Sequence, residues 1–128
     1  MNWQMRIFKS GRFDRFARKE RIEDAILCEA VRRAEQGLVD AELGNGLIKQ
    51  RVARRGAGKS GGFRTIVIFR TEIRAVFVFG FAKSDRSNLD DMELTAFRKA
   101  AKLVLSFSDA QMDAEIAAGR MIEMNCNG

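Results

Sequence analysis

Apolar and polar positions along the chain change their spacing several times, and each spacing predicts a different element. Residues 3–8 alternate loosely, which indicates an edge strand. Apolar residues over 13–17 then fall at helical spacing, amid several arginines. A second helical stripe predicts a helix over about 22–36, with Gly37 as its C-terminal stop.

The middle of the chain has the composition of strands. After a turn at 43–46, residues 47–53 mix apolar side chains with cations, and a glycine-rich turn at 55–62 follows. Two apolar runs, 63–69 and 73–81, carry β-branched and aromatic residues at both odd and even positions. Such strands are central and covered on at least one face, and their close spacing predicts an antiparallel pair.

The C-terminal third has a helical pattern. Ser87 or Asn88 can cap a helix whose first turn is acidic, which suits the positive end of the helix dipole. Ser108 and Gln111 match a capping box, which predicts a last short helix that ends at Gly119.

These elements follow one another in the order β-α-α-β-β-β-α-α. We therefore expect a single α+β domain over residues 1–128, with the N-terminal and C-terminal helices packed on one face of a small, mostly antiparallel sheet. The other face is then free to meet a substrate. The tail, from about 120 to 128, is expected to be flexible.

Composition narrows the classes of function. The chain has no histidine, which excludes histidine metal sites and Ser-His or Cys-His dyads. Cys28 and Cys126 have no metal-ligand spacing, and two cysteines are too few for a disulfide scaffold. No apolar run approaches the ~18 residues of a membrane span, and Arg6 and Lys9 interrupt the N-terminus too early for a signal peptide. We therefore expect a cytoplasmic protein with no metal, cofactor or membrane partner.

Positive charge is concentrated in the middle of the chain. The net charge is +6, but residues 43–74 alone hold +7, because eight cations there face a single acidic residue, Glu72. Residues 22–42 hold −4 and residues 103–128 hold −3. One face should therefore be electropositive and suited to RNA or DNA. Three cations around the glycine-rich turn are expected to bind RNA: Arg54, Arg55 and Lys59.

The glycine-rich turn partly resembles a phosphate-binding loop. Residues 58–60 (GKS) match the end of the pattern G-x-x-x-x-G-K-[ST], but Ala53 stands at the first glycine position. Such a loop must also lead into a helix, whose N-terminal amides hold the phosphates, whereas this one leads into the strand over 63–69. We therefore interpret it as a hairpin turn that carries a cation, and we reject nucleotide hydrolysis.

Five cations are expected to converge. Lys49 and Arg51 lie two residues apart on one strand, so their side chains share a face. Arg64 begins the next strand across the turn, and Lys83 and Arg86 follow the third. In a meander these positions meet at one end and one face of the sheet, where like charges repel unless an anion lies among them. On spacing alone, five solvated surface charges are the alternative.

Three segments resemble the RelE/HigB superfamily of toxin–antitoxin toxins, and its HigB-like branch in particular. The segments are 49–51 (KQR), 58–64 (GKSGGFR) and 79–87 (FGFAKSDRS). The resemblance covers most of the chain, from about Phe8 to Ile122. The fold of that family agrees with the order of elements predicted above.

This resemblance implies a toxin that cleaves mRNA, usually during translation on the ribosome and without a metal ion. The chemistry it implies is attack by an RNA 2′-hydroxyl on the neighbouring phosphate, with cations stabilising the oxyanionic phosphorane. By position, Arg64 matches the family's phosphate-contacting arginine. Lys49 and Arg51 match its paired basic residues, and Lys83 and Arg86 match the basic segment after its last strand.

The proton acceptor is not fixed by the resemblance. Several relatives use a Tyr or His near the C-terminus, and this chain has neither. Lys49, whose cationic neighbours disfavour a further positive charge, is one candidate. Asp85 is the nearest carboxylate candidate, although a salt bridge or a turn cap is the simpler role for it.

The resemblance also implies a co-expressed antitoxin of helix-turn-helix type. Either an acidic antitoxin segment lies across Lys49, Arg51 and Arg64, or a folded helix-turn-helix antitoxin docks on the N-terminal helices. The other expected partners are mRNA and the ribosome. Two other classes of function are alternatives to the nuclease: a ParE-like toxin that inhibits DNA gyrase, and a non-catalytic RNA- or DNA-binding module. The clustered cations favour the nuclease over the ParE-like toxin.

Overall fold

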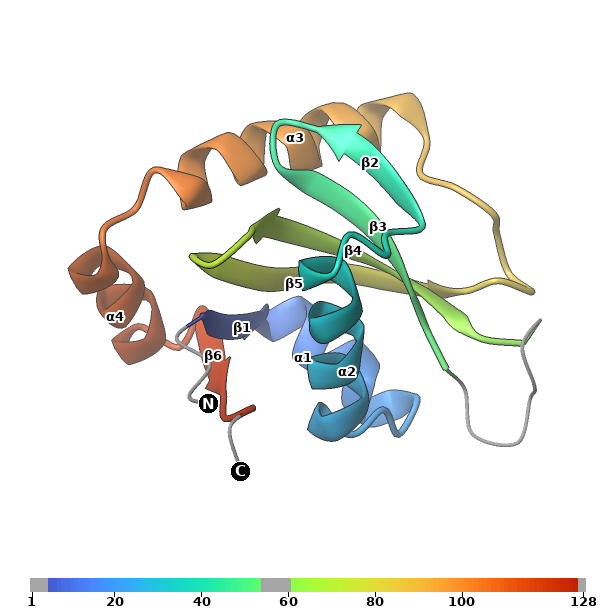
Figure 1. The fold of residues 1–128 in the computed structure, drawn as a ribbon, viewed down its shortest axis with the longest axis horizontal. Helices are drawn as coiled ribbons and strands as arrows, with labels where there is room; N and C mark the ends of the chain where they lie inside the picture. Colours follow the sequence, from blue (N-terminus) through green and yellow to red (C-terminus); the bar gives the residue numbers. More distant parts are fainter. Residues whose placement is uncertain (1–4, 54–60, 127–128) are drawn as a thin grey trace.

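A six-stranded sheet between two pairs of helices makes up the part of the chain that the computed structural model describes, residues 5–53 and 61–126 (Figure 1). The helices are α1 (Gly11–Lys19), α2 (Asp24–Glu35), α3 (Asp91–Leu105) and α4 (Asp109–Ala117). The strands are β1 (Arg6–Ser10), β2 (Ala41–Gly44), β3 (Leu47–Val52), β4 (Phe63–Arg70), β5 (Arg74–Ala82) and β6 (Met121–Met124). Within these described residues, no helix has the length and apolar character to cross a membrane.

The strands pair in the order β2-β3-β4-β5-β1-β6. β1 runs parallel to β5, and the other neighbouring pairs are antiparallel. The long meander β3-β4-β5 forms the centre of the sheet, at the apolar runs that predicted it. The predicted class, an α+β domain with a mostly antiparallel sheet, is confirmed.

Helices cover both faces of the sheet, whereas the sequence predicted helices on one face only. Under α1 and α2 lies a core cluster that includes Leu27 and Val67, and under α3 and α4 lies a second cluster that includes Ile68 and Val104. Val67 and Ile68 are neighbours on β4, so this strand places large apolar side chains on both faces. Each of those faces needs a layer of helices to exclude water.

Two short edge strands were missing from the predicted order. The predicted turn at 43–46 is confirmed, but it closes a hairpin between β2 and β3, and Gly44, Asn45 and Gly46 there have φ angles of 91°, 56° and 81°. Glycine and asparagine are the residues that tolerate this left-handed region. β6 pairs with β1, so the part of the tail from Met121 to Met124, which was expected to be flexible, belongs to the sheet.

The predicted helix ends are close to the observed ones. Gly37 follows α2 with a φ of 83°, and Ser108 forms the predicted capping box with Gln111 at the start of α4. The cap of α3 differs from the prediction. It is Asp90, which forms a capping box with Glu93, because the chain at Ser87 and Asn88 has not yet reached the helix.

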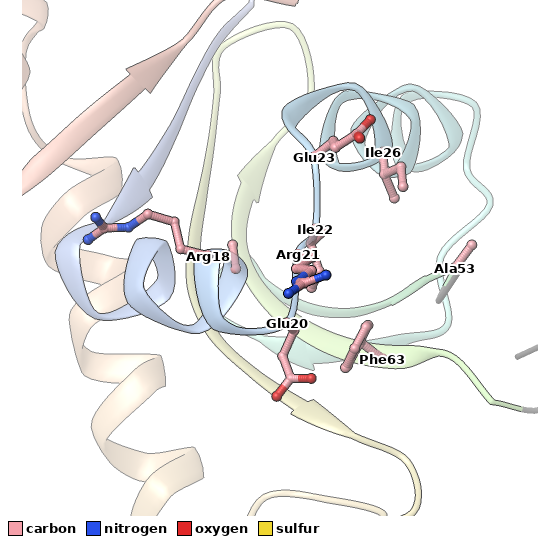
Figure 2. A pocket seen from close by; sticks show the side chains of 9 residues that line it. Arg18, Glu20, Arg21, Ile22, Glu23, Ile26, Ala53 and Phe63 are labelled. Atoms are coloured by element: carbon pink, nitrogen blue, oxygen red, sulfur yellow. The ribbon is translucent and has the colours of Figure 1, made fainter. Parts of the chain in front are cut away.

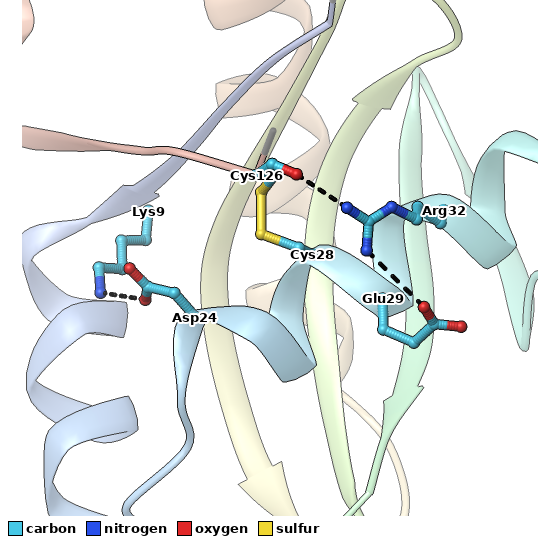
Figure 3. The surroundings of a disulfide bond; sticks show 6 residues. All are labelled: Lys9, Asp24, Cys28, Glu29, Arg32 and Cys126. Atoms are coloured by element: carbon cyan, nitrogen blue, oxygen red, sulfur yellow. Dashed lines mark hydrogen bonds and ion pairs between the residues drawn. A yellow bond between two sulfur atoms is a disulfide. The ribbon is translucent and has the colours of Figure 1, made fainter. Parts of the chain in front are cut away.

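A disulfide joins Cys28 on α2 to Cys126, just after β6 (Figure 3). The two cysteines are 98 residues apart in the sequence, so the bond ties the C-terminal edge strand to the helical layer. The Arg32 side chain donates a hydrogen bond of 2.8 Å to the carbonyl oxygen of Cys126 at the same place. No sequence pattern predicts that these two cysteines pair, because residues so far apart in the sequence come together only in the folded sheet.

Candidate functional site

The register of the central strands places three cations on one face of the sheet. Arg51 on β3 pairs directly with Arg64 on β4, and Lys49 lies two residues before Arg51. Arg64 pairs in turn with Phe81 on β5, and Phe81 belongs to the core cluster under α3. The three cations therefore lie on the α3 side of the sheet, where β3 ends and β4 begins. We call Lys49, Arg51, Arg64, Lys83 and Arg86 the cationic site.

Arg64 is the buried member of the cationic site. Its side chain is 9% exposed, and its Nε lies 3.4 Å from the Asp40 Oδ2. Its Nη1 is buried and has no hydrogen-bond partner in the described part of the chain. A buried donor without an acceptor is costly to leave in a folded protein, so this guanidinium stands out among the cations of the site.

Asp40 is a carboxylate of the site that sequence analysis missed. Its Oδ2 lies 3.9 Å from the Lys49 Nζ as well as beside Arg64. The residue directly precedes β2, and the pairing of Ala41 with Lys49 brings it to the cations. Because the short strand β2 was not predicted, no sequence signal placed Asp40 here.

Gln50 fixes the backbone at Asp40. Its Oε1 accepts a 3.1 Å hydrogen bond from the Asp40 N–H, and its Nε2 donates bonds of 2.9 Å to the carbonyl oxygens of Ala30 and Leu38. The Gln50 side chain is on the α2 face of β3, opposite to Lys49, and is buried. Its amide therefore links α2, the chain before β2, and β3 behind the cationic site.

Asn88 connects the cationic site to the segment before α3. Its Oδ1 accepts a 2.8 Å hydrogen bond from the Lys49 Nζ, and its carbonyl oxygen accepts bonds of 3.0 and 2.9 Å from the Nε and Nη2 of Arg86. Arg86 also pairs with Glu93 on α3. The hydrogen bond between these two side chains raises the pKa of Arg86 and lowers the pKa of Glu93. Arg86 therefore fixes the loop before α3 to that helix, and its guanidinium lies at the edge of the cationic site.

Two aromatic rings line the same edge. The Arg86 guanidinium carbon lies 5.9 Å from the centre of the Phe79 ring and 5.4 Å from that of Phe81. Arg12 of α1 approaches Phe79 at 4.8 Å. Phe79 also packs on Phe97 of α3, at 5.5 Å between ring centres. Phe81 is buried in the core cluster under α3 and Phe79 is partly buried against it, and the two rings also contact two guanidinium groups.

The remaining predicted residues fall into two groups. Arg51 and Lys83 are both exposed: Arg51 pairs with Arg64 across the strands, whereas Lys83 follows the last residue of β5 and makes no side-chain contact with the other four cations in the described part of the chain. Asp85 is exposed in the turn after β5; Asp40 is the carboxylate that contacts Lys49 and Arg64 in the described part of the chain. Three predicted RNA-binding residues, Arg54, Arg55 and Lys59, lie outside the described residues.

A separate hollow of about 470 Å³ opens on the other side of the sheet. Figure 2 shows its walls, which come from the end of α1, the connection to α2, and the start of β4. Phe63 lines the hollow and belongs to the core under α1 and α2, so the hollow does not open onto the cationic site. Its charged lining carries both signs, from Arg18 and Arg21 to Glu20 and Glu23.

The fold and the site define a class: a small α+β protein that presents clustered Lys and Arg side chains at one end of a central meander. Residues 5–124 match the family model described as the RelE toxin of the RelE/RelB toxin–antitoxin system. The chain therefore belongs to the RelE toxin family. No curated protein matches the chain.

Proposed function

We propose that this protein is a toxin that acts as a metal-independent endoribonuclease on mRNA, in the cytoplasm and on translating ribosomes. The observation that carries the proposal is the cluster of cations on one face of the sheet, in which the buried Arg64 pairs with Arg51 and shares the Asp40 carboxylate with Lys49. Membership of the RelE family supports the setting of a toxin–antitoxin system.

The reaction is a transesterification within the RNA. The 2′-oxygen of one nucleotide attacks the adjacent phosphorus, the bond from phosphorus to the 5′-oxygen breaks, and the products carry a 2′,3′-cyclic phosphate and a 5′-hydroxyl. The protein must hold the backbone in line and stabilise the charge that develops on the phosphorane. Arg64 and Lys49 supply that charge at the centre. The exposed Arg51 and Lys83 hold flanking phosphates. Arg86 borders the site and fixes the loop before α3.

A cleavage assay in a translation extract tests this function directly. We expect the purified protein to cut a translated message and to leave 5′-hydroxyl ends, as attack by the 2′-oxygen requires. The same message without translation shows whether the ribosome is required. RNA binding with no cutting under either condition would instead favour a non-catalytic binding module, and inhibition of DNA gyrase would favour a ParE-like toxin.

The partner we propose is an antitoxin of helix-turn-helix type encoded beside this chain. Co-expression with that neighbouring protein should restore growth and yield a complex that copurifies. The exposed cations at Arg51 and Lys83 offer an acidic antitoxin segment a complementary surface, which would speed association. Growth arrest that persists while both proteins are made, with no complex recovered, would contradict the toxin–antitoxin assignment.

A further inference from the structure

The carboxylate of Asp40 lies inside a group of cations that the proposed function uses to bind phosphate. We propose that Asp40 is the general base of the reaction, which takes the proton from the RNA 2′-hydroxyl; this inference rests on the proposed function. The chain has no histidine or tyrosine that could do so. A carboxylate at this position supplies the missing acceptor.

The substrate itself requires the base to lie beside the phosphate-binding group. The attacking 2′-oxygen lies only a few bonds from the phosphorus along the ribose and phosphodiester, and a general base must come within hydrogen-bond distance of the proton it removes. Asp40 fulfils this requirement, because its Oδ2 is 3.4 Å from the Arg64 Nε. The Lys49 Nζ lies 3.9 Å from the same oxygen, so the cations that would hold the phosphate flank the carboxylate.

Asp40 is both accessible and held in place. Its side chain is 28% exposed, so a ribose hydroxyl can reach it. Its backbone is fixed by the Gln50 amide, which is itself bonded to two carbonyl oxygens and buried. A base on a fixed backbone keeps its geometry before the substrate arrives, which lowers the cost of reaching the transition state.

The protons balance within the site. Asp40 accepts the 2′-hydroxyl proton as the new bond from the 2′-oxygen to phosphorus forms. The 5′-oxygen leaves with a proton from the Lys49 ammonium, whose Nζ lies 3.9 Å from the same carboxylate. After the products dissociate, exchange with water removes the proton from Asp40 and returns one to Lys49. The reaction needs no other reagent.

A role as a mere counter-ion predicts the opposite response. If Asp40 only neutralises Lys49 and Arg64, its removal strengthens the positive field and leaves RNA bound at least as tightly and cleaved at a similar rate. The variant Asp40→Asn separates the two roles, because the amide oxygen can still accept from Arg64 but cannot act as the base. Glu42→Gln is the matched control, since Glu42 is an exposed carboxylate two residues further on, in β2.

The experiment measures single-turnover cleavage, RNA affinity and thermal melting for the wild type and both variants. We expect Asp40→Asn to cleave at least about 100-fold more slowly, with affinity and melting temperature unchanged or raised, and Glu42→Gln to match the wild type. A substrate with sulfur at the bridging 5′ position, which leaves without a proton, should not restore Asp40→Asn.

Each other outcome overturns the inference. Cleavage by Asp40→Asn within about 10-fold of the wild type, or restoration by the 5′-sulfur substrate, would show that Asp40 is not the base. A slower variant that has also lost RNA affinity or melting temperature would make Asp40 a structural anchor. If the wild type itself cuts no RNA, the proposed function fails and this inference fails with it. An active wild type beside an unaffected Asp40→Asn variant would instead contradict this inference alone.

Discussion

Replacing Arg64 with alanine should lower the rate of RNA cleavage by about 10²–10³, and toxicity should be lost with it. The guanidinium is the buried cation of the site, so its field at the phosphorane is screened least by water. Its loss should leave the fold intact, because the substitution also removes a buried donor that has no partner in the described residues. The measurement is single-turnover cleavage, together with a thermal melt of each variant.

Two variants on the same strand make the Arg64 result specific. Arg70→Ala removes an exposed arginine at the far end of β4 and should leave cleavage unchanged, since the same charge is lost away from the site. Arg64→Lys keeps the charge but not the planar fork, and an intermediate rate is expected. A folded Arg64→Ala protein that cleaves RNA as fast as the wild type would exclude Arg64 from the reaction.

The centre of the fold was predictable because its strands carry strong local signals. β4 and β5 are long, apolar and rich in β-branched and aromatic residues, and no helix pattern competes with them. The edge strands were not predictable in this way. β2 and β6 are four residues each, and their polar residues are typical of loops as much as of edges.

The site was predictable where it depends on strand geometry alone. The two-residue spacing of Lys49 and Arg51, and the start of a strand at Arg64, are enough to predict that these cations share one face. Contacts between distant segments were not predictable. Asp40 reaches Lys49 only through the β2–β3 hairpin, and Arg86 is held by Glu93, a residue that no spacing or motif pairs with it.

Reducing the Cys28–Cys126 disulfide should lower the stability of the protein by about 2–4 kcal/mol, because the bond restricts the unfolded chain over a long loop. For a domain of this size, that corresponds to a fall in melting temperature of roughly 10 °C. Local unfolding should begin at β6, a four-residue edge strand that the disulfide ties to α2. Thermal melting with and without dithiothreitol measures the effect.

The double variant Cys28→Ser, Cys126→Ser controls for other effects of the reductant. It should melt like the reduced wild type and should not respond to dithiothreitol, and equal melting of oxidised and reduced wild type would contradict the prediction. Cleavage should be the same in both redox states at temperatures below the melt. The reason is that Cys28 packs on the α2 side of the sheet, whereas the cationic site lies on the α3 side. Because disulfides are rare in the cytosol, the lower stability of the reduced form is the one that applies in the proposed compartment.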